Sequence, residues 1–257
     1  MSIANEEFGD PADPAVLPVM GFGSQMIAWH EDFCRALARR GRHVIRYDNR
    51  DCGLSTTFDD PCRHGPVHRR GELALGIERA HVVGSSIGGM IAQTMAISRP
   101  ERVLTLTSMM SWTGESEYGR VGADAQAVLF SPRPADRERY IAAAAKKMVW
   151  ASKRYGSPAL LRGLAVQSYD RAYRPSGIGR QLGAMILGGS RADALREFRV
   201  PTLVPHGLDG TLIDPSGGSR TADLAPGAKL VLIPDMGHDR PRELWPEIID
   251  TLDAHTR

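Results

Sequence analysis

The 257-residue sequence predicts an α/β fold, with a mostly parallel sheet flanked by helices and a helical cap insertion. Short runs rich in Val, Leu and Ile alternate with longer stretches of helical periodicity. The runs are continuously apolar, which is typical of parallel strands buried on both faces. A long stretch without such runs separates the first ones from the last ones and predicts the insertion. The length and a hydrophobic content of 42% fit a single globular core.

The first half of the chain supplies most of the predicted strands. Apolar runs predict strands at 14–21, 42–49, 79–84 and 102–110. A helix is expected at 27–41, which ends on a glycine. Trp29, Phe33 and Leu37 recur at helical spacing within it, and this spacing favours a place in the core.

The strand pattern resumes near the end of the chain. Strands are expected at 200–207 and 228–238, and a closing helix at 241–256. The intervening sequence has a helical pattern, and its clearest predicted helices are at 135–156 and 177–189. We therefore expect an α/β core formed by 1–111 and 196–257, and a cap formed by residues 112–195.

Composition and charge argue against several classes of function. The 32 basic and 30 acidic residues are scattered and give a net charge of +2, so no nucleic-acid or membrane partner is expected. The chain has three cysteines, an odd number that does not suggest a disulfide framework: Cys34, Cys52 and Cys62. The N-terminus also lacks a signal-peptide pattern, and both features favour the cytoplasm. No metal or organic cofactor is expected, because HExxH, Cys/His ligand and P-loop patterns are absent. The expected assembly is a monomer or a homodimer.

A G-x-S-x-G pentapeptide at 84–88 is the clearest catalytic pattern. It lies between a predicted strand and a predicted helix, which is the context of a nucleophile elbow. A serine at the tip of so sharp a turn needs small neighbours, and Gly84 and Gly88 provide them. Ser86 is therefore the candidate nucleophile; the alternative is an ordinary strand-to-helix turn.

A serine nucleophile needs a general base, and the base is oriented by an acid. In hydrolases with this elbow the chain order is Ser, acid, His. His238 follows the last predicted strand and is the candidate base, with a surface-loop histidine as the alternative. His206 precedes the loop that should carry the acid, which favours a structural role.

Several segments together resemble α/β-hydrolase fold serine esterases, in particular the aclacinomycin methylesterase-like subgroup. They are 8–23, 43–56, 78–96, 100–110, 200–207 and 233–239. The resemblance implies that Ser86 is the nucleophile and His238 the base. It also implies an oxyanion hole formed by the backbone amides of Ile87, after the nucleophile, and Phe22, in the loop after the first predicted strand.

The same resemblance suggests where the substrate lies. Gly21 and Gly23 would let their loop approach the substrate, although an ordinary glycine turn is the alternative. Met110 and Trp112 lie where the sheet enters the cap and are candidates for an acyl pocket. Core packing explains these two residues equally well.

The triad acid departs from the family pattern. Family members carry it three residues after the glycine that ends the penultimate strand, and Gly210 occupies that position here. Asp209, one residue earlier, is the favoured acid. The other candidates are Asp214, farther along this loop, and Glu115 or Glu117, just inside the cap.

Two further features depart from the expected fold. The stretch 59–76 is poor in apolar residues where a crossover helix is expected, with two helical turns at most within 67–75. A short helix would leave the sheet beside the elbow partly uncovered and predicts lower stability or a deformed site. Pro18 and Pro205 each interrupt a predicted central strand, where a proline removes a ladder hydrogen bond unless it lies at an edge or a bulge.

Together these features predict a serine hydrolase that cleaves a carboxylic ester, for example a methyl ester or a small lipophilic ester, through a Ser-His-acid triad and an acyl-enzyme. The alternative of another class is a small-molecule binder that keeps the pocket but has lost the triad, and Gly210 favours it. A C–C bond hydrolase or a perhydrolase of the same fold is a further alternative.

Overall fold

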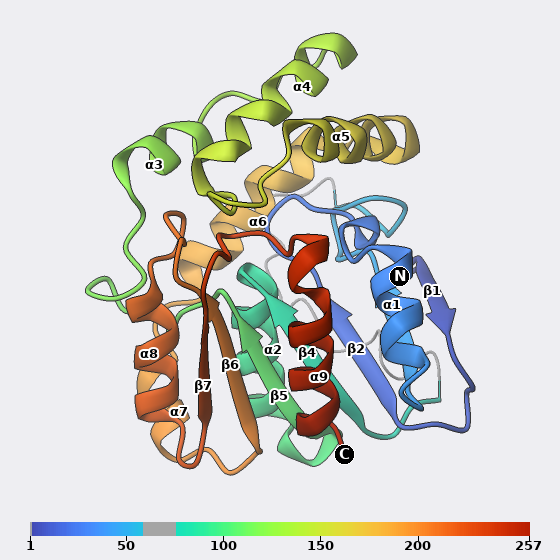
Figure 1. The fold of residues 1–257 in the computed structure, drawn as a ribbon, viewed down its shortest axis with the longest axis vertical. Coiled ribbons are helices and arrows are strands. Elements are labelled where there is room, and N and C mark those ends of the chain that lie inside the picture. The colour runs from blue at the N-terminus through green and yellow to red at the C-terminus, as the bar shows by residue number, and fades with distance from the viewer. Residues whose placement is uncertain (1, 59–75) are drawn as a thin grey trace.

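Seven strands form one sheet in the computed structural model, which describes residues 2–58 and 76–257 (Figure 1). Their order is β1-β3-β2-β4-β5-β6-β7, and β1 is antiparallel to β3 while the other pairs are parallel. The strands are β1 (Asn5–Phe8), β2 (Ala15–Val19), β3 (His43–Tyr47), β4 (Ala80–Ser85), β5 (Val103–Met109), β6 (Thr202–Gly207) and β7 (Lys229–Ile233). The mostly parallel sheet predicted from the sequence is confirmed.

Helices flank the sheet and fill the long stretch between β5 and β6. The α-helices are α1 (Glu31–Ala38), α2 (Ile87–Ser98), α3 (Ala123–Leu129), α4 (Arg137–Ala144), α5 (Pro158–Ala172), α6 (Pro175–Leu187), α7 (Ala192–Arg196), α8 (Pro215–Leu224) and α9 (Trp245–His255). Short 3-10 helices are η1 (Met26–Ala28), η3 (Pro100–Arg102), η4 (Ala145–Trp150) and η5 (Arg242–Leu244). The single helix predicted at 135–156 is in fact α4 followed by η4.

Each face of the sheet is covered by its own apolar cluster. On one face, η1, α1 and α9 bury Trp29, Phe33 and Leu37 against Val83 and Leu203 of the strands. On the other face, α2, α7 and α8 pack on the opposite side chains of β4, β5 and β6. Figure 1 shows α1 and α9 in front of the sheet and α2 behind it. The predicted core position of Trp29, Phe33 and Leu37 is confirmed, with each at most 3% exposed. The single helix predicted at 27–41 is in fact η1 followed by α1, with Trp29 between them.

The cap helices α3, α4 and α5 gather at one end of the sheet, at the top of Figure 1. This is the end where the parallel strands terminate. In the loop after β7, the His238 backbone amide donates to the Trp150 carbonyl of η4. In the loop after β2, the Gly23 amide donates to the Gln181 side chain of α6. In parallel α/β sheets this carboxyl edge is where ligands bind. The cap therefore covers the edge that carries the candidate site.

The two strand prolines lie where one neighbouring ladder has already ended. Pro18 is paired by register with Val83 of β4, whereas the β2–β3 pairing stops at Val16. Pro205 is paired with Val231 of β7, while β5 pairs with β6 only through Thr202 and Leu203. Neither proline therefore interrupts two ladders at once, which explains why central strands tolerate them.

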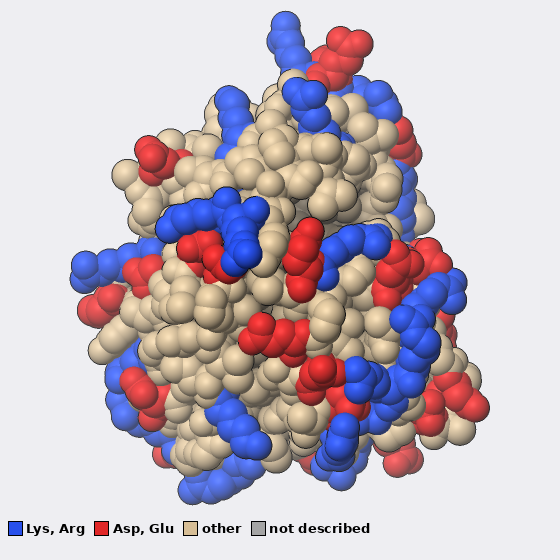
Figure 2. Space-filling view, viewed as in Figure 1, with Lys and Arg blue, Asp and Glu red and all other residues tan. Residues whose placement is uncertain are grey.

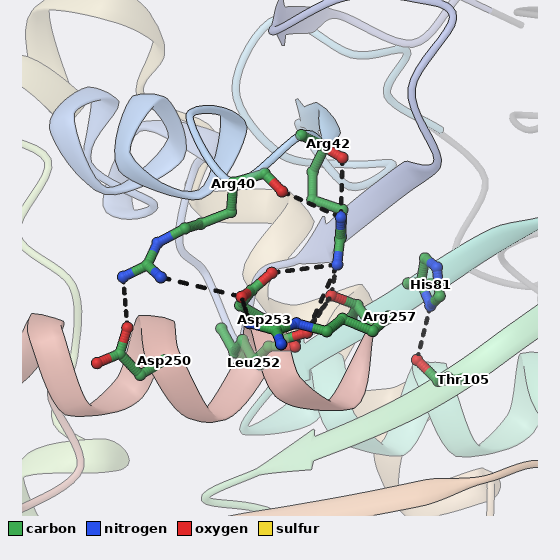
Figure 3. Close-up of polar contacts among 10 residues, drawn as sticks. Arg40, Arg42, His81, Thr105, Asp250, Leu252, Asp253 and Arg257 are labelled. Carbon is green, nitrogen blue, oxygen red and sulfur yellow. Dashed lines mark hydrogen bonds and ion pairs between the residues drawn. The ribbon is translucent and has the colours of Figure 1, made fainter.

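The C-terminal helix is tied to the turn before β3 by a cluster of charges (Figure 3). Arg42 donates from Nη2 to Asp253 Oδ1 over 3.1 Å, and Arg257 reaches Asp253 Oδ2 over 2.7 Å. Arg40 pairs with Asp250 one turn earlier in α9. These contacts hold α9 on α1 and keep that face of the sheet covered.

The described charges on the face drawn in Figure 2 do not gather by sign. Figure 2 shows Lys and Arg side chains intermingled with Asp and Glu over the visible face. No helix within residues 2–58 and 76–257 is long and apolar enough to cross a bilayer. The weak crossover helix expected within 67–75, and its effect on the sheet, lie outside the described residues.

Candidate active site

Ser86 sits at the tip of a strained turn between β4 and α2. Its backbone angles are φ 59° and ψ −126°, a region that non-glycine residues seldom adopt. The turn is held by the Ser86 amide, which donates to the Met109 carbonyl over 2.9 Å, and by the Gly89 amide, which donates to the Ser86 carbonyl over 2.8 Å. Such strain is found where surrounding structure over-determines a functional residue. Ser86 remains partly exposed and presents its hydroxyl at the sheet edge.

Small residues make this turn possible. A Cβ added to Gly84 would lie 2.1 Å from the Gly88 carbonyl oxygen, and one added to Gly88 would lie 2.2 Å from the Val19 carbonyl oxygen. Gly21 is equally constrained, since a Cβ there would lie 2.9 Å from Ser86 Cβ. The glycines of the motif and Gly21 therefore bring three backbone segments together around the serine.

Two backbone amides beside Ser86 are left without acceptors. Ile87 is the first residue of α2, so its N–H has no partner within the helix. Phe22 lies in a turn that the Ser24 amide closes on the Gly21 carbonyl over 3.3 Å, with Gly23 at φ 61°. Within the described part of the chain, no acceptor takes either the Phe22 or the Ile87 N–H.

His238 lies in the loop after β7 with its ring nitrogens buried. Neither Nδ1 nor Nε2 has a hydrogen-bond partner among the described residues, so no hydrogen bond joins the ring to Ser86. Burial, and then the charges of His206 and Arg240, lower the pKa of His238 to about 3. The imidazole is therefore neutral at pH 7, with a nitrogen available to accept a proton.

His206 occupies a different environment. It is fully buried at the end of β6, where Nε2 lies 3.0 Å from the Ile213 carbonyl oxygen. Its Nδ1 lies under α8, 2.6 Å from where a Cβ of Gly218 would stand. Burial lowers the pKa of His206 as well. The ring thus packs between β6 and α8.

The carboxylates considered for the triad acid contact other groups. Asp209 accepts the Lys153 amide over 3.1 Å and lies 3.4 Å from Lys153 Nζ. Asp214 caps the N-terminus of α8 by accepting the Ser216 amide. Glu115 pairs with Arg220 over 2.8 Å, which lowers its pKa, and Glu117 is exposed. None of the four hydrogen-bonds to His238 in this structure.

Gly210, at the expected acid position, lies beside His206. A Cβ there would be 2.8 Å from the Ile213 carbonyl oxygen and 3.7 Å from His206 Nε2. A larger residue at this position would require the carbonyl to move.

Sequence reasoning missed Arg240, which is buried beside the elbow. It donates from Nη1 to Ser85 Oγ over 2.9 Å and from Nη2 to the Ala28 carbonyl over 3.0 Å. Its guanidinium carbon stands 4.0 Å from the centre of the Trp29 ring. Burial lowers the pKa of Arg240 to about 10, and no ion pair joins it to a described carboxylate. Its place two residues after His238 was the one sequence feature that could have revealed it.

The proposed pocket residues lie around the same edge. Met110 is 1% exposed and adopts φ 48°, with its amide bound to the Pro205 carbonyl. Trp112 is partly buried and packs on Gly119 and Gly217. Gly23 faces Ile178 of α6. No cluster of three or more metal-ligating side chains occurs in the portion of the chain that the structure describes.

The loop after β3 binds the cap. Arg171 of α5 pairs with the fully buried Asp48 over 2.6 Å, and Arg180 of α6 pairs with Asp51 over 2.7 Å. Asp48 also accepts the Met26 and Leu54 amides. Two cap helices thus supply the cations for the carboxylates of this loop.

The chain is similar to known esterases. The chain is 28% identical over 293 aligned residues to the rhodomycin D methylesterases of Streptomyces sp. (strain C5) and Streptomyces peucetius, and each alignment covers 100% of this chain and 95% of the relative. These matches confirm the resemblance to methylesterases that the sequence indicated.

Solved structures show the same fold. The meta-cleavage product hydrolase of Pseudomonas fluorescens IP01 superposes with a TM-score of 0.77 at 20% identity, over 98% of this chain and 93% of that one. Esterase RhEst1 from Rhodococcus sp. ECU1013 superposes with a TM-score of 0.77 at 19% identity, over 99% and 95%. Residues 14–239 match the family described as the alpha/beta hydrolase fold, and we conclude that the chain belongs to this family.

Proposed function

We propose that this protein hydrolyses a carboxylic ester, with Ser86 as the nucleophile and His238 as the general base. The observation that carries the proposal is the strained turn that holds a partly exposed Ser86. The Phe22 and Ile87 amides, which have no acceptor among the described residues, support it. Two such amides form the donors that a tetrahedral oxyanion needs, each supplying about 3 kcal/mol in comparable sites.

The proposed reaction has two halves. Ser86 Oγ forms a bond to the ester carbonyl carbon while His238 takes the hydroxyl proton, and the proton then passes to the departing alkoxide. Water next attacks the acyl-enzyme with the same histidine as base, which releases the acid and restores Ser86. His238 is neutral at pH 7, as a proton acceptor must be, while its lowered pKa makes the imidazolium that forms in the reaction harder to stabilise.

The curated relatives favour a particular substrate class. Both are named as methylesterases of rhodomycin D, which supports a methyl ester or a small lipophilic ester as substrate. Met110, Trp112, Gly21 and Gly23 are the proposed pocket residues, because they lie at the edge that carries Ser86.

A non-catalytic binder is the second candidate, and Gly210 is the observation that favours it. The position expected for the acid carries no carboxylate, and His238 has no hydrogen-bond partner among the described residues. A pocket of this kind could retain a small ligand without activating the serine. The two candidates differ in the reactivity of Ser86.

The deciding experiment measures hydrolysis of short and medium p-nitrophenyl esters, together with labelling by a fluorophosphonate. We expect turnover and labelling in the wild type, and a loss of about a thousandfold or more in Ser86→Ala and His238→Ala. Folded protein with neither activity would support the binder. Labelling without ester turnover would favour C–C bond hydrolysis or perhydrolysis.

The acid is tested in the same assay. Asp209→Asn, Asp214→Asn and Glu115→Gln each remove one candidate carboxylate. A fall of several orders of magnitude in one variant would assign the acid to that residue. Full activity in all three would show that His238 works without these carboxylates.

A further inference from the structure

The turn that carries the Phe22 amide is bound directly by the cap. Gly23 donates its amide to Gln181 Oε1 of α6 over 2.9 Å, and Gln181 Nε2 donates to the Arg50 carbonyl over 3.3 Å. Ile178, one helical turn earlier, packs on the same glycine. A single face of α6 therefore rests on the Phe22–Gly23 turn.

A second contact ties the end of this segment to α5. Gln25 donates from Nε2 to the Ser168 and Ala172 carbonyls, over 2.6 and 2.7 Å, at the C-terminal end of the helix. Its Oε1 accepts from Arg171, which also binds the buried Asp48. The segment 21–25 is therefore held by two cap helices, and its position depends on both.

The orientation of the Phe22 N–H follows from these contacts. The Gly21–Phe22 peptide is planar and trans, so its C=O and N–H point in opposite directions. Its carbonyl accepts the Ser24 amide inside the turn, and Gln181 fixes the next peptide through Gly23. Loss of the Gln181 acceptor would let the turn rotate and would move the Phe22 N–H away from Ser86.

We infer that Gln181 is a positioning residue for the oxyanion hole, and that the cap therefore acts in the chemical step as well as in covering the site. This inference rests on the proposed ester hydrolysis. It assigns to Gln181 no contact with substrate, because its two polar atoms are occupied by Gly23 and Arg50.

The inference is tested by Gln181→Met, which keeps the length of the side chain and removes the acceptor. We expect kcat on p-nitrophenyl acetate to fall about tenfold to a hundredfold, less than the loss of a whole oxyanion donor, with KM changed little. Affinity for a trifluoromethyl ketone, whose adduct with Ser86 carries an oxyanion, should fall by the same factor as kcat.

Two further variants separate positioning from folding. Gln181→Glu retains an acceptor for Gly23 and should keep kcat within about threefold of the wild type. Gln167→Met makes the same change at an exposed position of α5 and should leave kcat unaltered. Thermal unfolding of each variant is measured alongside.

The outcomes distinguish this inference from the proposed function. An inactive, unlabelled wild type would remove the ester hydrolase proposal itself. An active wild type with Gln181→Met at full kcat would overturn the positioning role alone. Equal losses in Gln181→Met and Gln181→Glu, without a matching loss of trifluoromethyl ketone affinity, would also overturn it.

Discussion

Ser86 keeps a backbone conformation that its side chain disfavours. At φ 59° a β-carbon is strained, and glycine is the residue that adopts such angles freely. We therefore expect Ser86→Gly to be more stable than Ser86→Ala by about 1 to 3 kcal/mol, although both lack the hydroxyl. Chemical denaturation of the two inactive variants measures the difference.

The comparison has an internal control at another position. Asp235 also has positive φ, at 57°, but lies in an ordinary loop. Asp235→Gly against Asp235→Ala should show how much positive φ alone contributes. Equal stability of the two Ser86 variants would mean that the turn relaxes once the hydroxyl is removed.

The burial of His238, together with the charges of His206 and Arg240, predicts an unusual pH profile. A histidine base works when neutral, so activity falls as pH drops through its pKa. Because the pKa of His238 is lowered to about 3 from 6.5, we expect kcat/KM to persist well below pH 6.5. Arg240→Met removes one cause of the lowered pKa, so the acid limb should move to higher pH.

The pH profile is measured on p-nitrophenyl acetate, with circular dichroism at each pH to separate unfolding from titration. An acid limb near pH 6.5 in the wild type would contradict the prediction. The prediction would also be contradicted if the acid limb of the Arg240→Met profile lay at the same pH as that of the wild type.

The sequence identified Ser86 as a candidate because strict turn geometry leaves a recognisable glycine spacing. It identified His238 because that residue follows the last predicted strand, in the chain order Ser, acid, His. It could not identify Arg240 in the same way. A buried arginine is recognisable only once its partners are known, and Ser85, Ala28 and Trp29 come from distant parts of the chain. The structure does not assign the acid either, since Asp209, Asp214 and Glu115 each bind another group and Glu117 is exposed.

At the scale of elements, helix glycines differ according to what lies opposite them. In α8, a Cβ on Gly218 would lie 2.6 Å from the buried His206 Nδ1, whereas Gly163 of α5 has no atom within 4 Å. We expect Gly163→Ala to stabilise the protein by about 1 kcal/mol, as helix propensity predicts. Gly218→Ala should destabilise it despite the same propensity.

Thermal unfolding of the two alanine variants checks this contrast. Stabilisation by both would show that α8 can move away from His206 without cost. Helix α8 was not predicted from the sequence, because Gly217 and Gly218 lower its helix propensity. The structure shows that close packing requires both glycines.

The first strand was also missed. The sequence predicted 14–21 as the first strand, but β1 precedes it at Asn5–Phe8. Its polar sequence carries no apolar run, because it is an edge strand with one neighbour in the described sheet. Cross-strand pairs stabilise it instead, with Glu6 opposite Arg46 and Glu7 2.8 Å from His43 Nε2.

At the scale of the whole molecule, the cap is joined to the core through a buried ion pair. Arg171→Met would leave the fully buried Asp48 without its cation. Breaking such a pair costs about 3 to 5 kcal/mol, because the remaining charge stays desolvated. We expect a loss of that order in denaturant unfolding, and partial recovery when Asp48→Asn is added.

An exposed pair gives the matched control. Arg154 and Asp235 lie 3.0 Å apart, with side chains 65% and 40% exposed. Arg154→Met should change the free energy of unfolding little, because water screens an exposed ion pair. Similar losses in Arg171→Met and Arg154→Met would mean that Asp48 gains water when its partner is removed.

The overall architecture could be predicted because parallel strands and their covering helices leave a continuous apolar pattern. The core and cap boundaries at 111/112 and 195/196 stay a prediction. The attachment of the cap could not be foreseen, since residues 48–51 and 171–180 are far apart in the chain and only the fold brings them together.

The two ion pairs of the loop after β3 also bear on how this fold can be altered. Asp48 and Asp51 each depend on an arginine that the cap supplies. A chimera that received the cap of a relative would leave both carboxylates without a cation unless the grafted cap carried matching arginines. The loop after β3 and the cap should therefore be exchanged together when an enzyme with a new substrate range is sought.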